Sequence, residues 1–197
     1  QDGLDIPLVN ALEANWYQVH PDLHQQLSGP IDRSSMSFQA AGVLPVDASS
    51  WNRPYSPLLR YPWERSYDAL LGMAHSVDAS PFDGHVLRYC NPITGGDVMP
   101  TMGAQLQRLD AGFATKAHRH TGNSMVTVAK GHGHSIINGE RFDWKEHDVF
   151  CIPAWAWHEH INGSSHDDAV LFSFDDRPVI RSLALFREQA HPDGTQR

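Results

Sequence analysis

Apolar residues recur every three to four positions in two stretches of the N-terminal part of the chain. The first stretch, residues 4–27, predicts an amphipathic helix that ends near His20-Pro21, with a further turn over residues 22–27. The second predicts a helix over residues 61–76, with Pro62 at its start. Residues 28–58 lie between them, are rich in Pro, Ser and Asp and lack periodicity, so we expect mostly loop there.

From about Val86 the apolar pattern changes to short strand-like runs bounded by turn residues. Asn138-Gly139 between two such runs is a strong signal for a two-residue hairpin. Closely spaced short strands of this kind are typical of a β-sandwich or barrel. The expected strands are 104–109, 114–120, 124–129, 134–137, 140–144, 149–152, 155–161 and 169–174.

The pattern divides the chain into a helical and loop arm, residues 1–85, and a mainly β domain, residues 86–197. We expect the β domain to end in an amphipathic helix over residues 178–189, followed by a polar, frayed tail after His191. The arm is rich in aromatic side chains, which predicts that it packs on another surface, and we expect a homo-oligomer. These side chains are Trp51, Tyr55, Tyr61, Trp63 and Tyr67.

Charge and composition narrow the classes of partner. The formal net charge is -8 and there is no long Lys/Arg run, which argues against nucleic acid. No apolar run reaches membrane-spanning length, so we expect no membrane partner. Two cysteines make no disulfide framework and favour a reducing compartment, with the cytoplasm as the default. The chain does not begin with Met, which fits a trimmed piece of a longer protein.

Histidine is the unusual component, since seven of the 13 histidines fall between positions 118 and 160. Alternate residues of a strand share a face, so His118 and His120 can direct two imidazoles at one point. His158 from a later strand would complete a set of three metal ligands, and His160, on the same face, is either the ligand instead or a pocket residue. The same alternation points Trp155 and Trp157 away from the metal. We expect the remaining histidines to be ordinary surface or core residues: His132, His134, His147 and His166.

Three protein ligands would leave up to three coordination positions open, which is typical of a catalytic rather than a structural metal site. The open positions suffice for a chelating substrate together with dioxygen. Because imidazole binds a metal only when neutral, affinity should fall as pH drops through the titration range of the rings. Iron, manganese, nickel and zinc all remain open on this reasoning.

The spacing of the histidines resembles the two sequence motifs of the cupin superfamily. The first motif is matched at Gly112, His118, His120 and Gly131, with Ser124 in the place of the usual glutamate. The second is matched at Pro153, His158 and Asn162, with His147 and Trp155 in the places of two glycines. The resemblance implies a jelly-roll β-barrel.

Further phrases resemble the gentisate, salicylate and 1-hydroxy-2-naphthoate dioxygenase family, and in particular the second (C-terminal) cupin half with its helical connector. That resemblance implies Fe(II) held by His118, His120 and His158, and cleavage by O2 of an aromatic ortho-hydroxy acid such as gentisate. It also implies that Gln107 and His160 act on the substrate in the pocket. The phrases lie at residues 87–96, 98–101, 118–121, 142–144, 155–160 and 171–179.

One departure from the family keeps other functions open. Val126 stands where the catalytic cupin of the family has an arginine that helps to hold substrate, and Arg88, Arg108 and Arg119 are the candidates to replace it. An alternative is therefore a non-catalytic, metal-retaining cupin half of a two-cupin assembly. Another metal-dependent cupin activity, such as an isomerase, is a third hypothesis.

Overall fold

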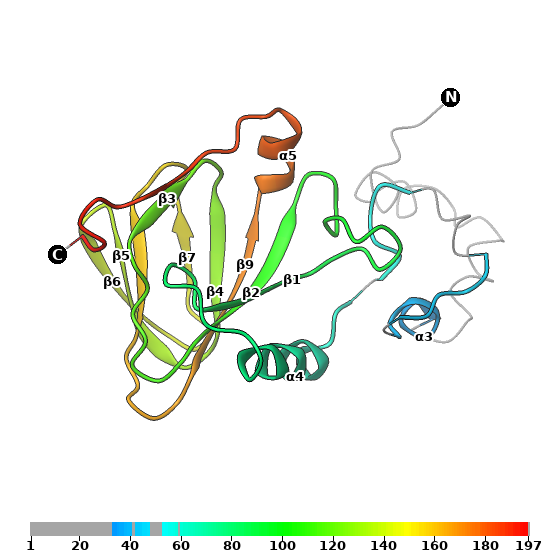
Figure 1. The fold of residues 1–197 in the computed structure, drawn as a ribbon, viewed down its shortest axis with the longest axis horizontal. Helices are drawn as coiled ribbons and strands as arrows, with labels where there is room; N and C mark the ends of the chain where they lie inside the picture. Colours follow the sequence, from blue (N-terminus) through cyan, green and yellow to red (C-terminus); the bar gives the residue numbers. More distant parts are fainter. Residues whose placement is uncertain (1–32, 41, 48–52, 59, 197) are drawn as a thin grey trace, which may run out of the picture.

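The computed structural model describes residues 33–40, 42–47, 53–58 and 60–196 and contains two antiparallel five-stranded sheets (Figure 1). One sheet has the strand order β1-β2-β9-β4-β7 and the other the order β10-β3-β8-β5-β6. This arrangement confirms the expected mainly β, jelly-roll class. The strands are β1 (His85–Arg88), β2 (Gly103–Leu109), β3 (His118–His120), β4 (Ser124–Lys130), β5 (His132–Ile137), β6 (Glu140–Lys145), β7 (Val149–Ile152), β8 (His158–Asn162), β9 (Ala169–Asp175) and β10 (Glu188–Ala190).

The strand predictions agree closely with these bounds, with two exceptions. The hairpin between β5 and β6 turns at Asn138 and Gly139, whose φ angles of 50° and 83° fit the predicted two-residue turn. The expected strand 114–120 is a strand only from His118, since Ala114 makes no more than an isolated bridge to Ile161. The expected strand 155–161 starts at His158, because Trp155 adopts a left-handed φ of 62° that interrupts extended backbone.

Apolar side chains from both sheets meet between them and form the core. Strand alternation places them there: the burial pattern along β4 alternates strictly over its first five residues. Ile137 and Trp144 of this cluster belong to the sheet that also carries β3 and β8. The buried members of this cluster are Leu109, Val126, Val128, Ile137, Trp144, Ile152, Ala156, Ala169 and Leu171.

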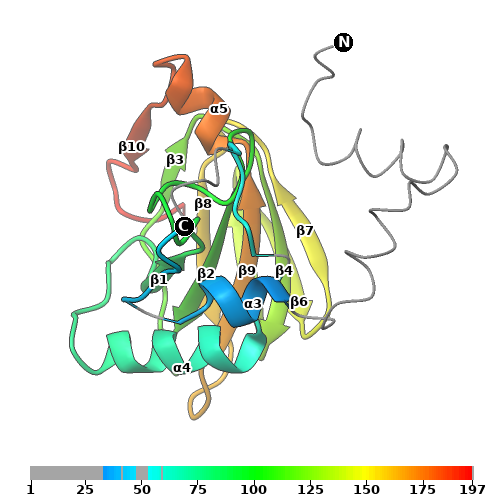
Figure 2. The same cartoon turned by 90° about the vertical axis from the view of Figure 1, so that its right-hand side faces the viewer.

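Two described helices belong to the arm. Helix α4 (Trp63–Ala74) confirms the prediction over 61–76 and packs Leu70, fully buried, beneath β1 and β2 (Figure 2). Helix α3 (Arg33–Phe38) lies in the part expected to be loop, so that prediction was wrong for these six residues. The predicted helix over 4–27 lies outside the described residues. No helix in the described ranges is long and apolar enough to span a membrane.

The expected C-terminal helix over 178–189 is wrong in its second half. Helix α5 (Arg177–Ser182) ends after six residues, and Ala184 then takes a left-handed φ of 57°. The chain continues as β10, which pairs with the otherwise free edge of β3, so edge pairing prevails over the helical periodicity. The tail is not frayed up to Gln196, whose side-chain amide donates to the Ile136 carbonyl at 2.8 Å.

Candidate metal centre

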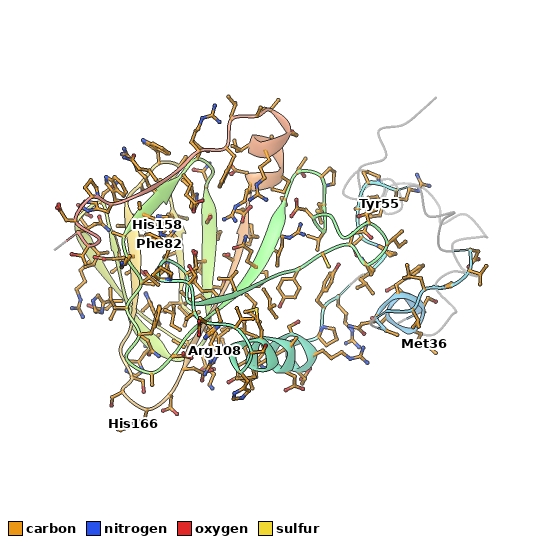
Figure 3. All side chains as sticks on the ribbon, in the orientation of Figure 1. Met36, Tyr55, Phe82, Arg108, His158 and His166 are labelled. Carbon is orange, nitrogen blue, oxygen red and sulfur yellow. The ribbon has the colours of Figure 1, made fainter. Side chains whose placement is uncertain are left out.

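Three imidazoles converge on the inner face of the second sheet. His118 and His120 point the same way from β3, and His158 stands directly opposite His118 in the β3–β8 register. One nitrogen from each ring lies within 4.8 Å of one from each of the others, and the side chains are only 4%, 8% and 3% exposed. The predicted ligand set is therefore assembled in one place, and Figure 3 shows His158 inside the barrel.

Burial favours the neutral form of two of these rings. It lowers the pKa of His120 to about 4, with a smaller contribution from the positive charge of Arg177. Burial likewise holds the pKa of His158 well below the usual 6.5, again helped by neighbouring histidines. The expected loss of metal affinity on acidification is therefore displaced to lower pH than for exposed imidazoles.

The donor set fits a divalent metal ion. The Nδ1 atoms of His118 and His120 are buried and have no hydrogen-bond partner among the described residues, which is costly for polar atoms. His158 Nδ1 lies 3.0 Å from the Ala156 carbonyl, which can only accept, so Nδ1 carries the proton and Nε2 keeps its lone pair. Neutral imidazole lone pairs gathered in one dry place suit a first-row divalent cation.

His160 has a different role because of its neighbours. Its Nδ1 lies 2.7 Å from the Ser135 hydroxyl, which accepts a hydrogen bond from Trp144 Nε1 at 2.9 Å. The Ser135 proton has no other acceptor among the described residues, so the hydroxyl donates to His160 Nδ1 and the proton of His160 is on Nε2. Burial lowers the pKa of His160 to about 3, so the ring is a neutral donor, and it falls outside the converging set of His118, His120 and His158.

Gln107 and the candidate arginines do not point at the three imidazoles in this structure. Gln107 Nε2 donates to the Asp83 carbonyl at 2.8 Å, so its amide holds the turn before β1. Arg88 pairs with Asp97 at 3.1 Å, and Arg108 is engaged by Asp110 and Asp168. The side chain of Arg119 lies over the rings of Trp155 and Trp157 and donates to Gln189.

Arg177 is the cation that the sequence reasoning missed. The positive charge of Arg177 adds to burial in lowering the pKa of His120, and its guanidinium lies 3.7 Å from the Asp175 carboxylate. The ring of Phe186 stacks on His120 at a centroid distance of 6.3 Å, and the Arg177 guanidinium carbon lies 5.6 Å from the centre of that same ring. The position of Arg177 directly after Asp175-Asp176 did not indicate a role at the metal centre. Arg177 comes close to β3 only when the C-terminal segment folds.

The remaining histidines and the two tryptophans lie outside the converging set of imidazoles. His132, His147 and His166 are exposed, His134 is partly buried, and none of the four joins the converging set. Trp155 and Trp157 precede β8, so alternation does not apply to them, and their rings lie against the guanidinium of Arg119.

Three positions of the second cupin motif have a clear structural role in the backbone. The residues in the places of the two motif glycines, His147 and Trp155, keep positive φ angles of 74° and 62°. The side-chain amide of Asn162 donates to the carbonyls of Leu109, Asp110 and Asp167 at 2.8–3.1 Å and so fixes the end of β8.

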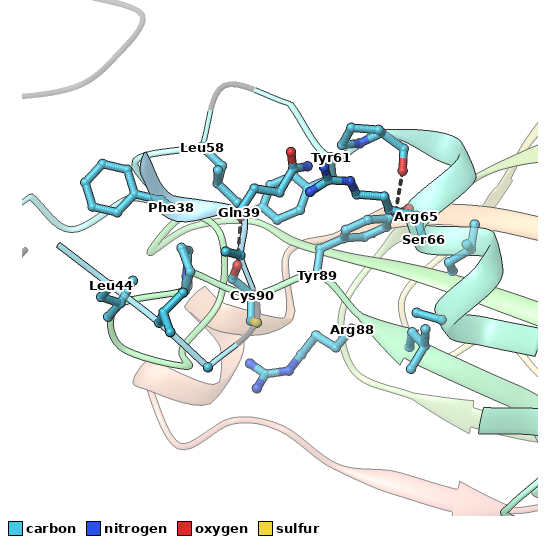
Figure 4. A pocket seen from close by; sticks show the side chains of 18 residues that line it. Phe38, Gln39, Leu44, Leu58, Tyr61, Arg65, Ser66, Arg88, Tyr89 and Cys90 are labelled. Carbon is cyan, nitrogen blue, oxygen red and sulfur yellow. Dashed lines mark hydrogen bonds between the residues drawn. The ribbon is translucent and has the colours of Figure 1, made fainter. Parts of the chain in front are cut away.

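A large cavity of about 1060 Å³ lies away from these histidines, between α3, α4 and β1 (Figure 4). It is largely apolar and is lined by Tyr61, Tyr89 and Leu106, among others. Tyr61 donates across it to the Cys90 carbonyl at 2.7 Å. Among the described residues no group of three or more His, Cys, Asp or Glu side chains converges in this space, so the chemistry of the molecule is better assigned to the barrel.

Comparison with known proteins agrees with the fold and the histidines. The sequence model described as a cupin domain matches residues 105–175. The chain is 40% identical over 192 residues to a 5-aminosalicylate 1,2-dioxygenase of a Comamonas species, covering 96% of this chain and 50% of that protein. It is 34% identical over 187 residues to gentisate 1,2 dioxygenase 1 of Aquipseudomonas alcaligenes, covering 95% and 52%.

A solved structure gives the same relationship. The salicylate 1,2-dioxygenase of Pseudoaminobacter salicylatoxidans, crystallised as an adduct with gentisate, matches with a TM-score of 0.71 at 29% identity. The match covers 81% of this chain and 44% of that one, and the chain spans about half the length of the curated relatives it matches. The chain therefore belongs to the cupin superfamily and, within it, to the family of gentisate, salicylate and 1-hydroxy-2-naphthoate dioxygenases.

Proposed function

We propose that this chain is, or forms part of, an Fe(II)-dependent dioxygenase that cleaves the ring of an aromatic ortho-hydroxy acid such as gentisate. The observation that carries the proposal is the buried, converging set of His118, His120 and His158. The names of the relatives, which act on 5-aminosalicylate and gentisate, support the substrate class.

Charge favours this class of substrate. Three neutral imidazoles leave the double positive charge of a divalent ion uncompensated, and Ser124 replaces the glutamate of the usual cupin motif. A carboxylate beside a phenolate is a chelating dianion that matches such a site. Bound iron would supply the redox chemistry through which an aromatic acid reacts with dioxygen.

In this proposal the side chains around the metal orient the substrate and provide a hydrogen-bond donor. The N–H at His160 Nε2 is available to hydrogen-bond an oxygen of the substrate, while the low pKa of the ring keeps it neutral. Arg177, which lies 3.7 Å from the Asp175 carboxylate and over the ring of Phe186 beside His120, is a candidate to attract the substrate carboxylate. Gln107 contributes through the turn it holds rather than by direct contact with the imidazoles.

Oxygen uptake tests the function directly. Protein loaded anaerobically with Fe(II) should consume oxygen and change the ultraviolet spectrum of gentisate, salicylate or 1-hydroxy-2-naphthoate as the ring opens. His158→Ala should abolish metal binding and uptake, whereas His166→Gln, which removes an exposed loop imidazole, should leave both unchanged. A folded, iron-loaded protein that consumes no oxygen with any of the acids would refute the proposal.

A second candidate is a metal-retaining cupin half without activity of its own. It is favoured by the buried, apolar Val126, by the engagement of Arg88, Arg108 and Arg119 elsewhere, and by the half-length match to relatives. Binding of metal without any change in its spectrum on addition of gentisate would favour this reading. Turnover that continues without oxygen would instead point to another activity, such as an isomerase.

We also expect a homo-oligomer in the cytoplasm. Within the described part of the arm, Met36 and Val46 are largely exposed apolar side chains, and Trp63 is 39% exposed. Light scattering that gives the mass of one chain would refute the oligomer.

A further inference from the structure

The two segments that carry the three imidazoles are also joined on the outer face of their sheet. Arg119 is the middle residue of β3, so strand alternation directs its side chain away from the two histidines of that strand. Its guanidinium carbon lies 4.3 Å from the ring centre of Trp155 and 4.2 Å from that of Trp157. Trp157 directly precedes His158, so these three residues, the Arg119 clamp, connect β3 to the start of β8.

Strand β10 holds the clamp as well. Gln189 lies opposite Arg119 in the β10–β3 register, and its Oε1 accepts hydrogen bonds from Arg119 Nε at 3.0 Å and from a terminal guanidinium nitrogen at 2.7 Å. The ring of His191 packs edge-on against Trp157 at a centroid distance of 4.7 Å, and the His191 amide donates to the Ala117 carbonyl at 2.9 Å. The guanidinium is therefore fixed by contacts from two segments besides its own strand.

This restraint matters because β3 is short. The strand has three residues, and its pairing with β8 consists of the single pair His118–His158. The His120 carbonyl accepts from the Trp155 amide at 2.8 Å, which ties the loop before β8 to the same strand. Rotation of so short a strand about its axis would move two of the three imidazoles relative to the third. Because inward and outward side chains share one backbone, a fixed Arg119 opposes that rotation.

The backbone of Trp155 supplies an independent observation. Its φ of 62° is unfavourable for a bulky side chain, and glycine is the usual residue at this place in the cupin motif. The side chain is 39% exposed, so burial in the core is not what keeps the indole in this conformation. Strained residues persist where surrounding contacts fix them, and the ring of Trp155 has its contact with Arg119.

We propose that Arg119 is a positioning residue for the metal centre, which acts through the Arg119 clamp to set the distance between the imidazoles of β3 and that of His158. The proposal rests on the three-histidine metal centre of the proposed function. It adds no ligand to that centre, and the clamp touches neither the metal nor the substrate. Ligands held in one arrangement should retain a metal ion longer than ligands that can shift.

Trp155→Gly separates positioning from stability. Glycine removes the ring from the clamp but adopts a positive φ freely, so the release of strain offsets the lost contact, and the urea midpoint of the metal-free protein should stay near that of the unsubstituted protein. The variant loaded with Co(II) should release the metal to a chromophoric chelator about tenfold faster, with shifted visible bands. A residue that only stabilised the fold would change the urea midpoint and leave the bands in place.

Three companion variants complete the test. Arg119→Met keeps an unbranched apolar stem and loses the guanidinium, so it should release Co(II) faster in the same way. Trp155→Phe keeps an aromatic face for the guanidinium and should retain the spectrum and the release rate of the unsubstituted protein. Arg141→Met is the matched control, because Arg141 is an exposed arginine on β6 that pairs with Asp143, and it should change neither quantity.

If Trp155→Gly and Arg119→Met keep both the visible bands and the release rate while His158→Ala loses the metal, the Arg119 clamp has no positioning role and the proposal is wrong. If Arg119→Met does not fold, Trp155→Gly decides alone, because glycine suits the backbone at that position. If the unsubstituted protein binds neither Co(II) nor Fe(II), the proposed function fails, and the positioning role fails with it.

Discussion

Acidification should destabilise the metal-free protein well above the pH at which carboxylates protonate. His120 and His160 are buried and neutral, with pKa values lowered to about 4 and about 3 from 6.5, mainly by burial. Below pH 6.5 the unfolded chain takes up protons on these rings and the folded chain does not, so stability falls as pH falls. The stability that each neutral ring contributes is fully present above pH 6.5. This contribution declines as the pH falls, until the folded-state pKa of that ring is reached.

The size of the effect follows from these values. One pH unit of differential protonation is worth about 1.4 kcal/mol, so at about pH 5 each ring lowers the free energy of unfolding by about 2 kcal/mol. The two together give about 4 kcal/mol between about pH 8 and about pH 5, a large part of a typical 5–15 kcal/mol. His158, whose pKa is also lowered by burial, acts in the same direction.

Urea unfolding followed by tryptophan fluorescence, in the presence of a chelator and at several pH values, measures this dependence. His160→Gln cannot gain a proton and should remove about 2 kcal/mol of the difference, although it lowers stability at all pH values. His166→Gln controls for the loss of a histidine as such, since it is exposed. A stability that stays flat from about pH 8 to about pH 5, or an unchanged slope in His160→Gln, would refute the reasoning.

Three further substitutions test single contacts. Ser135→Ala leaves Trp144 Nε1 and His160 Nδ1 without a partner and should cost about 1–3 kcal/mol in urea unfolding, with metal content retained and turnover reduced. Gly133→Ala should prevent soluble expression, because its Cβ would lie 2.6 Å from a ring carbon of Trp144. Arg177→Gln should raise KM for the aromatic acid about tenfold with a smaller change in kcat, since a charge-assisted contact is worth about 1.5–3 kcal/mol; equal KM values would exclude Arg177 from substrate binding.

Local alternation was enough to predict the ligands on β3. Because side chains two apart share a face, His118 and His120 had to point together once their segment was extended. The third ligand could not come from alternation alone, since the pairing of His118 with His158 joins residues far apart in the sequence. The motif spacing supplied it, and the positive φ angles of His147 and Trp155 show that the motif constrains the backbone even where glycine is absent.

Contacts between segments far apart in the chain could not be predicted from the sequence. The turn at Ser80–Gly84 shows no periodicity, and Asp83 meets His118 only because Gln107 and Lys116 hold that turn against the barrel. The C-terminal segment has a helical pattern, yet the free edge of β3 draws it into a strand, and this brings Phe186 beside His120. Hydrophobic patterning cannot report such competition between a local preference and an unpaired sheet edge.

The difference between His158 and His160 shows how neighbours decide what an imidazole does. Both rings are buried on β8, two residues apart and facing the same side. The partner of His158 Nδ1 is a carbonyl, which accepts a hydrogen bond from Nδ1–H and leaves the lone pair of Nε2 free. The partner of His160 Nδ1 is the Ser135 hydroxyl, whose proton has no other acceptor among the described residues, so the hydroxyl donates to Nδ1 and the ring proton of His160 is on Nε2. Strand alternation alone left both histidines as candidates, and the buried Ser135 gives His160 a hydrogen-bond partner of a different kind from that of His158.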